Sequence, residues 1–132
     1  MISSDDYLIR QVVQLVDAVN AIISGTPADI PEEEIAESID AAYGQLLGQN
    51  RALVDMLDTE SAARLVGATF QVRAYVDVLL TDAAYQRHRG ETQKCADLAV
   101  RAEAFLGTLP KSDEDRDRHG RVAALLTTEP YR

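Results

Sequence analysis

The chain is poor in residues that cross-link or stack. Its 132 residues include one cysteine, Cys95, no tryptophan and only 5% aromatic residues. A single cysteine excludes a disulfide within the chain, which fits a reducing compartment. With so few rings, the core must be built from Leu, Val, Ile and Ala. That mixture, at 46% apolar residues overall, favours closely packed helices over a sheet.

Long apolar runs are also missing. No stretch approaches the ~20 apolar residues that a membrane-spanning helix needs. The start of the chain has no basic region and leads into Asp5 and Asp6, unlike a signal peptide. The length fits one domain. We therefore expect a single helical domain over residues 1–132, located in the cytoplasm and without a membrane partner.

Basic residues are scarce in the first part of the chain. Residues 1–50 contain one base, Arg10, against nine acids, whereas residues 51–132 contain twelve bases against thirteen acids. The formal net charge is −9 and the isoelectric point about 4.6. That sign argues against nucleic acid as a partner, because its phosphates would be repelled. The acidic part is either a solvated face or a docking surface for a basic partner.

The first predicted helix spans Asp5 to Ser24 and ends at Gly25-Thr26-Pro27. Its apolar stripe is wider than one helix face requires. The helix is therefore central to the domain or partly covered by a second subunit. We select four of its residues as a candidate interface, either within the chain or between two chains: Leu8, Val12, Leu15 and Val19.

A second helix is expected from Pro31 to Gly48, with Glu32, Glu33 and Glu34 in its first turn. Carboxylates are favoured there by the helix dipole, and successive residues do not converge on a metal ion. Together with Glu37 they form a candidate acidic docking face. Ile35, Ile39, Ala42, Leu46 and Leu47 provide the inner face.

The stretch from Phe70 to Phe105 predicts a helical hairpin with a tight break at Arg89-Gly90-Glu91. Apolar residues recur in both arms at steps of three and four. Short helices are expected before it, with Asp58 or Thr59 as a cap, and a last helix after Ser112. The fold class is all-α, with six or seven helices in packed antiparallel hairpins. Asp40-Ala41-Ala42-Tyr43 recurs as Asp82-Ala83-Ala84-Tyr85, either as an internal repeat or by coincidence.

No cluster of residues forms a catalytic or metal-binding signature. Neither His88 nor His119 has a partner at ligand spacing, and Cys95 falls on an inward stripe. The serines lack a nucleophile elbow, and no glycine-rich phosphate loop is present. We therefore predict no catalytic residue, no metal and no cofactor.

The hairpin residues Ala84-Tyr85, Gly90, Cys95, Ala99 and Ala102 resemble a tetratricopeptide repeat, with small residues and a Tyr before the turn. Asp6-Tyr7-Leu8-Ile9-Arg10, then Leu46-Leu47-Gly48 and then the tetratricopeptide-like hairpin follow one another along the chain. With these segments the whole chain resembles a family of small bacterial proteins of unknown function. The resemblance implies an all-helical fold and carries no activity or catalytic residue.

Three functions follow as hypotheses. The leading one is a non-enzymatic module for protein–protein interaction or self-association, as a homodimer or with another protein. The second is a helical groove that binds a basic peptide or partner through Glu32, Glu33, Glu34 and Glu37. The third is a small hydrolase-type enzyme, which would require acids converging in a deep pocket.

Overall fold

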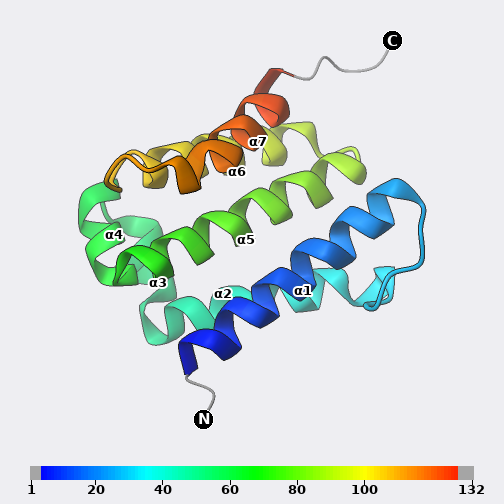
Figure 1. Cartoon of the computed structure of the whole chain (residues 1–132), viewed down its shortest axis with the longest axis horizontal. Coiled ribbons are helices and arrows are strands. Elements are labelled where there is room, and N and C mark those ends of the chain that lie inside the picture. Colours follow the sequence, from blue (N-terminus) through cyan, green and yellow to red (C-terminus); the bar gives the residue numbers. More distant parts are fainter. Residues whose placement is uncertain (1–3, 128–132) are drawn as a thin grey trace.

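The computed structural model describes residues 4–127, with side-chain environments from residue 6 onward. These residues form α-helices and three short 3₁₀ turns, packed as antiparallel neighbours (Figure 1). The elements are α1 (Ser4–Ser24), η1 (Glu32–Glu34), α2 (Ile35–Leu47), η2 (Gly48–Asn50), α3 (Arg51–Met56), α4 (Thr59–Val66), α5 (Thr69–His88), α6 (Thr92–Leu106), η3 (Asp113–Asp115) and α7 (Arg116–Thr127).

Helix α5 is the centre of the domain. It runs between α1 and α2 on one side and α6 and α7 on the other, and it contacts all four (Figure 1). Its buried residues cover most of its circumference: Val72, Ala74, Tyr75, Val76, Val78, Leu79, Leu80, Thr81, Ala83 and Tyr85. A helix that is apolar nearly all round belongs in a core. The expectation that the chain packs around this hairpin agrees with the structure.

The α5–α6 turn is closed by backbone hydrogen bonds at the predicted break. The Glu91 N–H donates to the Gln86 carbonyl at 2.8 Å, and the Gly90 N–H donates to the Arg87 carbonyl at 3.0 Å. This pair of bonds is the Schellman arrangement, which requires a left-handed residue after the helix. Gly90 supplies it with a φ of 84°. The turn then directs α6 back along α5.

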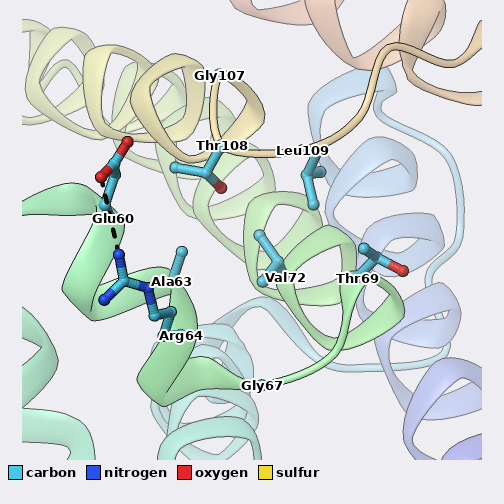
Figure 2. Close-up of a pocket in the computed structure, with 9 residues that line it drawn as sticks. All are labelled: Glu60, Ala63, Arg64, Gly67, Thr69, Val72, Gly107, Thr108 and Leu109. Carbon is cyan, nitrogen blue, oxygen red and sulfur yellow. Dashed lines mark ion pairs between the residues drawn. The ribbon is translucent and has the colours of Figure 1, made fainter.

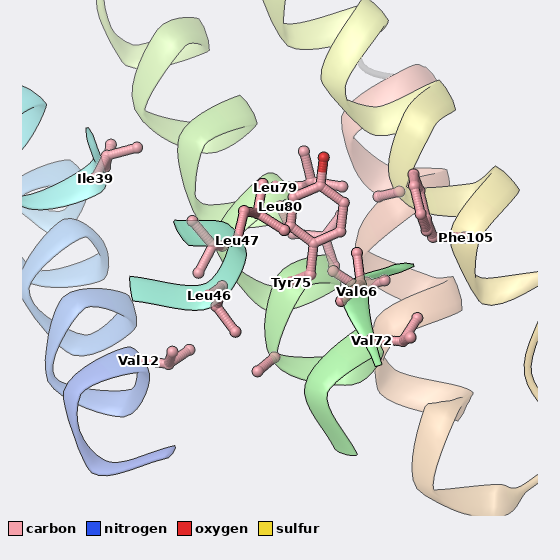
Figure 3. Packing of buried hydrophobic residues seen from close by; sticks show 14 of the residues in the cluster. Val12, Ile39, Leu46, Leu47, Val66, Val72, Tyr75, Leu79, Leu80 and Phe105 are labelled. Atoms are coloured by element: carbon pink, nitrogen blue, oxygen red, sulfur yellow. The ribbon is translucent and has the colours of Figure 1, made fainter. Parts of the chain in front are cut away.

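The core is aliphatic with a small aromatic centre (Figure 3). Tyr75 of α5 contacts Phe105 of α6 edge-on, with ring centroids 4.9 Å apart, and Tyr43 of α2 at 6.1 Å. Leu46 and Leu47 of α2 pack on the other side of Tyr75 in the same view. Edge-to-face ring pairs add to the stabilisation from burial alone. Three of the seven aromatic residues of the chain thus fix how α2, α5 and α6 meet.

The start of α2 differs from the prediction. Glu32, Glu33 and Glu34 form the 3₁₀ turn η1, and α2 begins after them at Ile35. Tight 3₁₀ turns are frequent at helix N-termini, where i to i+4 partners are not yet available. Caps at α4 and η3 are as expected. Asp58 accepts from the Ser61 N–H, and Ser112 accepts from the Glu114 N–H, each at 3.1 Å.

Candidate functional site

Two hollows flank α5 on different sides, and each joins charged residues from helices far apart in sequence. The α1–α7 groove has α5 as its floor, with a volume of about 140 Å³. It is lined by Ile9, Val12, Val13, Phe70, Arg73, Ala74, Asp77, Glu114 and Arg118. The tyrosine–arginine cleft, of about 190 Å³, lies between α2, α3, α5 and α6. Its lining is Tyr43, Leu47, Arg51, Asp55, Tyr75, Leu79, Asp82, Leu98 and Arg101.

One side of the α1–α7 groove is an alternating chain of charges. Arg73 donates from Nε and Nη2 to the Asp115 carboxylate at 3.0–3.3 Å. Arg118 donates from Nη1 to Asp115 at 3.0 Å and from Nε and Nη2 to Asp77 at 2.8 and 2.9 Å. Each carboxylate therefore meets at least one guanidinium fork, which is the strongest form of ion pair. This network joins α7 to α5.

Asp115 is the most buried charged residue of this network, at 3% exposure. Burial alone would raise the pKa of its carboxyl. The hydrogen bonds and charge of Arg73, followed by those of Arg118, outweigh that effect and hold the pKa below its usual value. The guanidinium donors of Arg73 and Arg118 are already paired within the chain. The network therefore stabilises the fold and leaves few hydrogen-bond donors for a substrate.

The opposite wall of this groove is apolar and comes from α1. Ile9 and Val13 are 43% and 50% exposed, while their neighbour Val12 is 4% exposed. Of the candidate interface residues, Val12, Leu15 and Val19 are buried within the single chain, and Leu8 is partly buried against the core. The side of α1 that remains open is therefore the one that carries Ile9 and Val13.

The tyrosine–arginine cleft concentrates polar groups that start from four helices. The Tyr43 hydroxyl donates to Asp82 Oδ2 at 2.8 Å, and the Gln86 amide donates to Asp82 Oδ1 at 3.0 Å. Arg101 donates from Nε to the Tyr75 hydroxyl at 2.9 Å and from Nη2 to Asp55 at 3.2 Å. Polar groups that converge in a partly apolar cleft are the usual mark of a small-molecule site.

Both cleft tyrosines have perturbed acidity. Burial, followed by the charge and hydrogen bond of Asp82, raises the pKa of Tyr43 far above 10. Burial also raises the pKa of Tyr75, although Arg101 partly opposes that effect. Both phenols therefore keep their protons at neutral pH. Residues with perturbed pKa values in a cleft are functional candidates.

A third hollow, of about 370 Å³, lies between α4, the start of α5 and the loop after α6 (Figure 2). Its charged residues are Glu60 and Arg64, which pair at 3.9 Å while both side chains remain 79% exposed. Thr108 and Leu109 face them from the opposite wall. Exposed ion pairs contribute little binding energy, so this hollow has no comparable concentration of fixed polar groups.

The four carboxylates of the acidic docking face are exposed to solvent. Glu32, Glu33, Glu34 and Glu37 are all exposed on η1 and the first turn of α2. Glu32 Oε2 lies 3.8 Å from His88 Nε2, at the end of α5. The other three form no ion pair within residues 4–127. The structure thus brings these residues together but leaves most of their charge unneutralised.

The remaining chemical candidates are placed as follows. Cys95 is buried, and burial raises the pKa of its thiol more than the charge of Arg87 lowers it. A buried thiol of this kind is a poor nucleophile. His119 Nδ1 lies 2.9 Å from Glu103 Oε1 between α7 and α6, both partly exposed. Within residues 4–127, no group of three or more His, Cys, Asp or Glu side chains is arranged to hold a metal ion.

Sequence reasoning did not find the tyrosine–arginine cleft or the Arg73–Asp115 network. The paired residues lie 39 and 42 positions apart, and no local pattern marks them. For the cleft, the available signal was the repeated Asp-Ala-Ala-Tyr segment, because Tyr43 of the first copy contacts Asp82 of the second. For the Arg73–Asp115 network, the weaker signal was the alternation of arginine and acidic residues around residues 113–118.

No helix within residues 4–127 combines the length and apolar character required to cross a bilayer. Comparison with protein families, with characterised proteins and with solved structures finds no match. The chain is a small all-helical protein, and its function has to be argued from its surfaces. The tetratricopeptide-like interpretation of the hairpin remains a prediction.

Proposed function

We propose that the protein is a non-catalytic self-association module whose partner is a second copy of the same chain. The observation that carries this proposal is the outward side of α1, where Ile9 and Val13 are 43% and 50% exposed. Two neighbouring branched apolar side chains at i and i+4 form a continuous ridge on a helix. In this proposal the inner seam of Leu8, Val12, Leu15 and Val19 holds α1 on the core, so that the ridge faces outward.

Charge complementarity favours a second copy over an unrelated partner. Arg10, Val13 and Asp17 are spaced at three and four residues and share one side of α1. Arg10 and Asp17 are exposed, and neither forms an ion pair with any residue that the structure describes. If two α1 helices pack antiparallel around Val13, each Arg10 lies opposite Asp17 of the other copy. An isologous two-fold contact repeats that pair on both sides of the axis.

Charge exchange tests this arrangement. Molar mass is measured by light scattering at two protein concentrations for four proteins: wild type, Arg10→Asp, Asp17→Arg and the double exchange. The wild type is expected to dimerise. Each single change should weaken the dimer about tenfold, because two pairs become repulsive. The double exchange should restore it, since the pairs return with reversed polarity.

The melting temperature provides the control, because both residues are exposed and neither has an ion-pair partner among the described residues. All four proteins should unfold at similar temperatures when monomeric. A wild type that stays monomeric at both concentrations contradicts the proposal. So does a double exchange that remains as weak as the single changes, since the contact would then not be antiparallel around Val13.

A second candidate function rests on the acidic docking face. Three of its four carboxylates lack an ion pair within the described chain, and all four are exposed. Such a face would bind a basic peptide. The tetratricopeptide-like interpretation, in which a helical groove receives a peptide, belongs to this candidate. Binding of an oligolysine peptide should weaken with salt and after Glu33→Lys combined with Glu37→Lys. If neither salt nor the double substitution weakened binding of the peptide, this candidate function would be excluded.

A further inference from the structure

The tyrosine–arginine cleft lies apart from the α1 side proposed above for self-association. It lies between α2, α3, α5 and α6, and no residue of α1 lines it. Its two arginines are held over aromatic rings. The Arg101 guanidinium lies 5.1 Å from the Phe105 ring centroid and 5.8 Å from that of Tyr75. The Arg51 guanidinium lies 5.3 Å from the Tyr43 ring. Stacking of this kind fixes the orientation of a guanidinium before any ligand binds.

Part of the hydrogen-bonding capacity of these groups is unused. Arg51 donates from Nη1 to Asp40, which leaves Nε and Nη2 without an acceptor among the described residues. Arg101 uses Nε and Nη2, which leaves Nη1. The Tyr75 hydroxyl accepts from Arg101, and its own proton has no described acceptor. The free groups are donors, and a cleft with surplus donors suits a ligand with acceptor oxygens.

The acidic residues of the cleft do not cancel this surplus. Asp82 already accepts from Tyr43 and Gln86, one hydrogen bond to each carboxylate oxygen. Asp55 lines the cleft and Asp40 pairs with Arg51, and their side chains are 64% and 70% exposed. Solvent screens them strongly, and each occupies only one terminal nitrogen of its arginine. The remaining nitrogens stay available to a second carboxylate.

Apolar side chains define the rest of the ligand. Leu47 and Leu79 are buried, and Leu98 is partly buried, so the cleft offers an aliphatic surface beside the polar groups. Its volume is about 190 Å³. This is less than the roughly 300 Å³ at which pockets for drug-sized ligands begin. A ligand of this cleft must therefore be small.

From this arrangement we propose that the tyrosine–arginine cleft binds the carboxylate of a small aliphatic acid. The carboxylate accepts from Arg51, from Arg101 Nη1 and from the Tyr75 hydroxyl, and the aliphatic tail covers Leu47, Leu79 and Leu98. The protonated state of Tyr75 at neutral pH supports this role, because a phenolate would repel the ligand. A peptide that ends in leucine presents the same chemistry from a second source.

Binding is measured by chemical-shift changes in two-dimensional NMR with 4-methylpentanoate as the probe. Three comparison ligands separate the contributions of the charge and of the aliphatic tail to binding. 4-Methylpentanamide lacks the charge, acetate lacks the tail, and isopentylamine reverses the charge. For eight heavy atoms we expect a Kd on the order of 1 mM. The amide and acetate should bind at least about tenfold more weakly, and the amine should not shift the resonances of Arg51 and Arg101.

Variants assign the binding to the cleft. Arg51→Gln should weaken 4-methylpentanoate about tenfold, because it removes a charge-assisted pair. Arg64→Gln is the matched control, since Arg64 is exposed on α4 outside the cleft. A Gly-Gly-Leu peptide with a free or amidated C-terminus distinguishes a protein terminus from a free acid as the source of the carboxylate.

Three results would overturn the proposal. These are equal binding of the acid and its amide, equal affinity in Arg51→Gln and wild type, and shifts that appear away from the cleft. Because Arg51 is partly exposed, with 41% of its side chain accessible, its replacement is not expected to unfold the protein. The dimer measurement is independent of all three, so failure of either proposal leaves the other testable.

Discussion

Arg73 and Asp115 are 42 residues apart in sequence and joined by a forked ion pair at the start of α7. Arg73 Nε lies 3.0 Å from Asp115 Oδ1, and Nη2 lies 3.2 Å from Oδ2. Arg118 adds a third donor nitrogen at 3.0 Å. Because α7 has few other buried residues, with Val122 as its buried apolar anchor, this carboxylate has a large share in holding α7 on α5.

Replacement of Asp115 should therefore destabilise the protein. We expect Asp115→Asn to lower the free energy of unfolding by about 2–4 kcal/mol, because two arginines lose their buried partner. Urea unfolding followed by circular dichroism measures the change. Asp113→Asn is the matched control in the same turn, since Asp113 is 94% exposed and pairs with the exposed Arg116. Its effect should stay within about 0.5 kcal/mol. Equal effects would contradict this role of Asp115.

The same carboxylate predicts a pH dependence in acid. Its pKa in the folded protein lies below the value of about 3.9 expected in the unfolded chain. The unfolded chain therefore binds the proton more tightly. The contribution of Asp115 to stability is complete above about pH 5 and declines as pH falls towards the folded pKa. Accordingly, the stability difference between wild type and Asp115→Asn should narrow below about pH 4. A constant difference down to pH 2 would contradict a depressed pKa.

The fold could be predicted from the sequence where the signals are local. The period of apolar residues located α1, the α5–α6 hairpin and the inner face of α2, and Gly90 located the turn. The charge networks could not be predicted, because Tyr43 meets Asp82 and Arg73 meets Asp115 only after distant helices pack. The sequence also could not show which side of α1 stays exposed. The helical period places Val12 and Val13 on different sides of the helix, but only the packing of the other helices determines which of the two side chains is buried.

The two cleft tyrosines predict that the stability of the protein also depends on pH at alkaline pH. The pKa values of Tyr43 and Tyr75 are raised above about 10, the value for an exposed tyrosine. Their contribution to stability is complete below about pH 10 and is lost as pH rises further, because the unfolded chain releases these protons first. Ultraviolet absorbance of tyrosinate should show that these two phenols ionise at higher pH than an exposed tyrosine. Tyr43→Phe should remove one of them. A tyrosinate titration above about pH 10 that Tyr43→Phe leaves unchanged would contradict this prediction.

The backbone conformation of Gly67, between α4 and α5, predicts that a side chain at this position destabilises the protein. Its φ of 128° lies in a region that side-chain-bearing residues rarely adopt, and an added Cβ would collide with the Gln71 side chain. Gln71 Oε1 accepts from the Ala68 N–H at 2.8 Å and so closes the start of α5. We expect Gly67→Ala to destabilise the protein by about 1–3 kcal/mol.

Gly44→Ala provides a control of opposite sign. Gly44 lies inside α2, is exposed, and has open space where a Cβ would stand. Alanine should stabilise the helix there by about 0.5–1 kcal/mol. Thermal unfolding of both variants measures the contrast. Two changes of the same sign would mean that the φ of Gly67 is not a constraint on the fold.

The adjacent residues Val12 and Val13 separate the core side of α1 from its proposed association side. Val12 is 4% exposed and Val13 is 50% exposed. Val12→Asp places a charge in the core, and we expect it to cost about 3–5 kcal/mol and to lower the melting temperature at every protein concentration. Val13→Asp leaves the core intact, so the stability of the monomer should change by less than about 0.5 kcal/mol. The molar mass of Val13→Asp by light scattering, however, should fall to that of the monomer.

If Val12→Asp changed neither melting temperature nor molar mass, the inner seam would be wrongly assigned. If Val13→Asp left a wild-type dimer undisturbed, self-association would have to use a surface other than the outward side of α1.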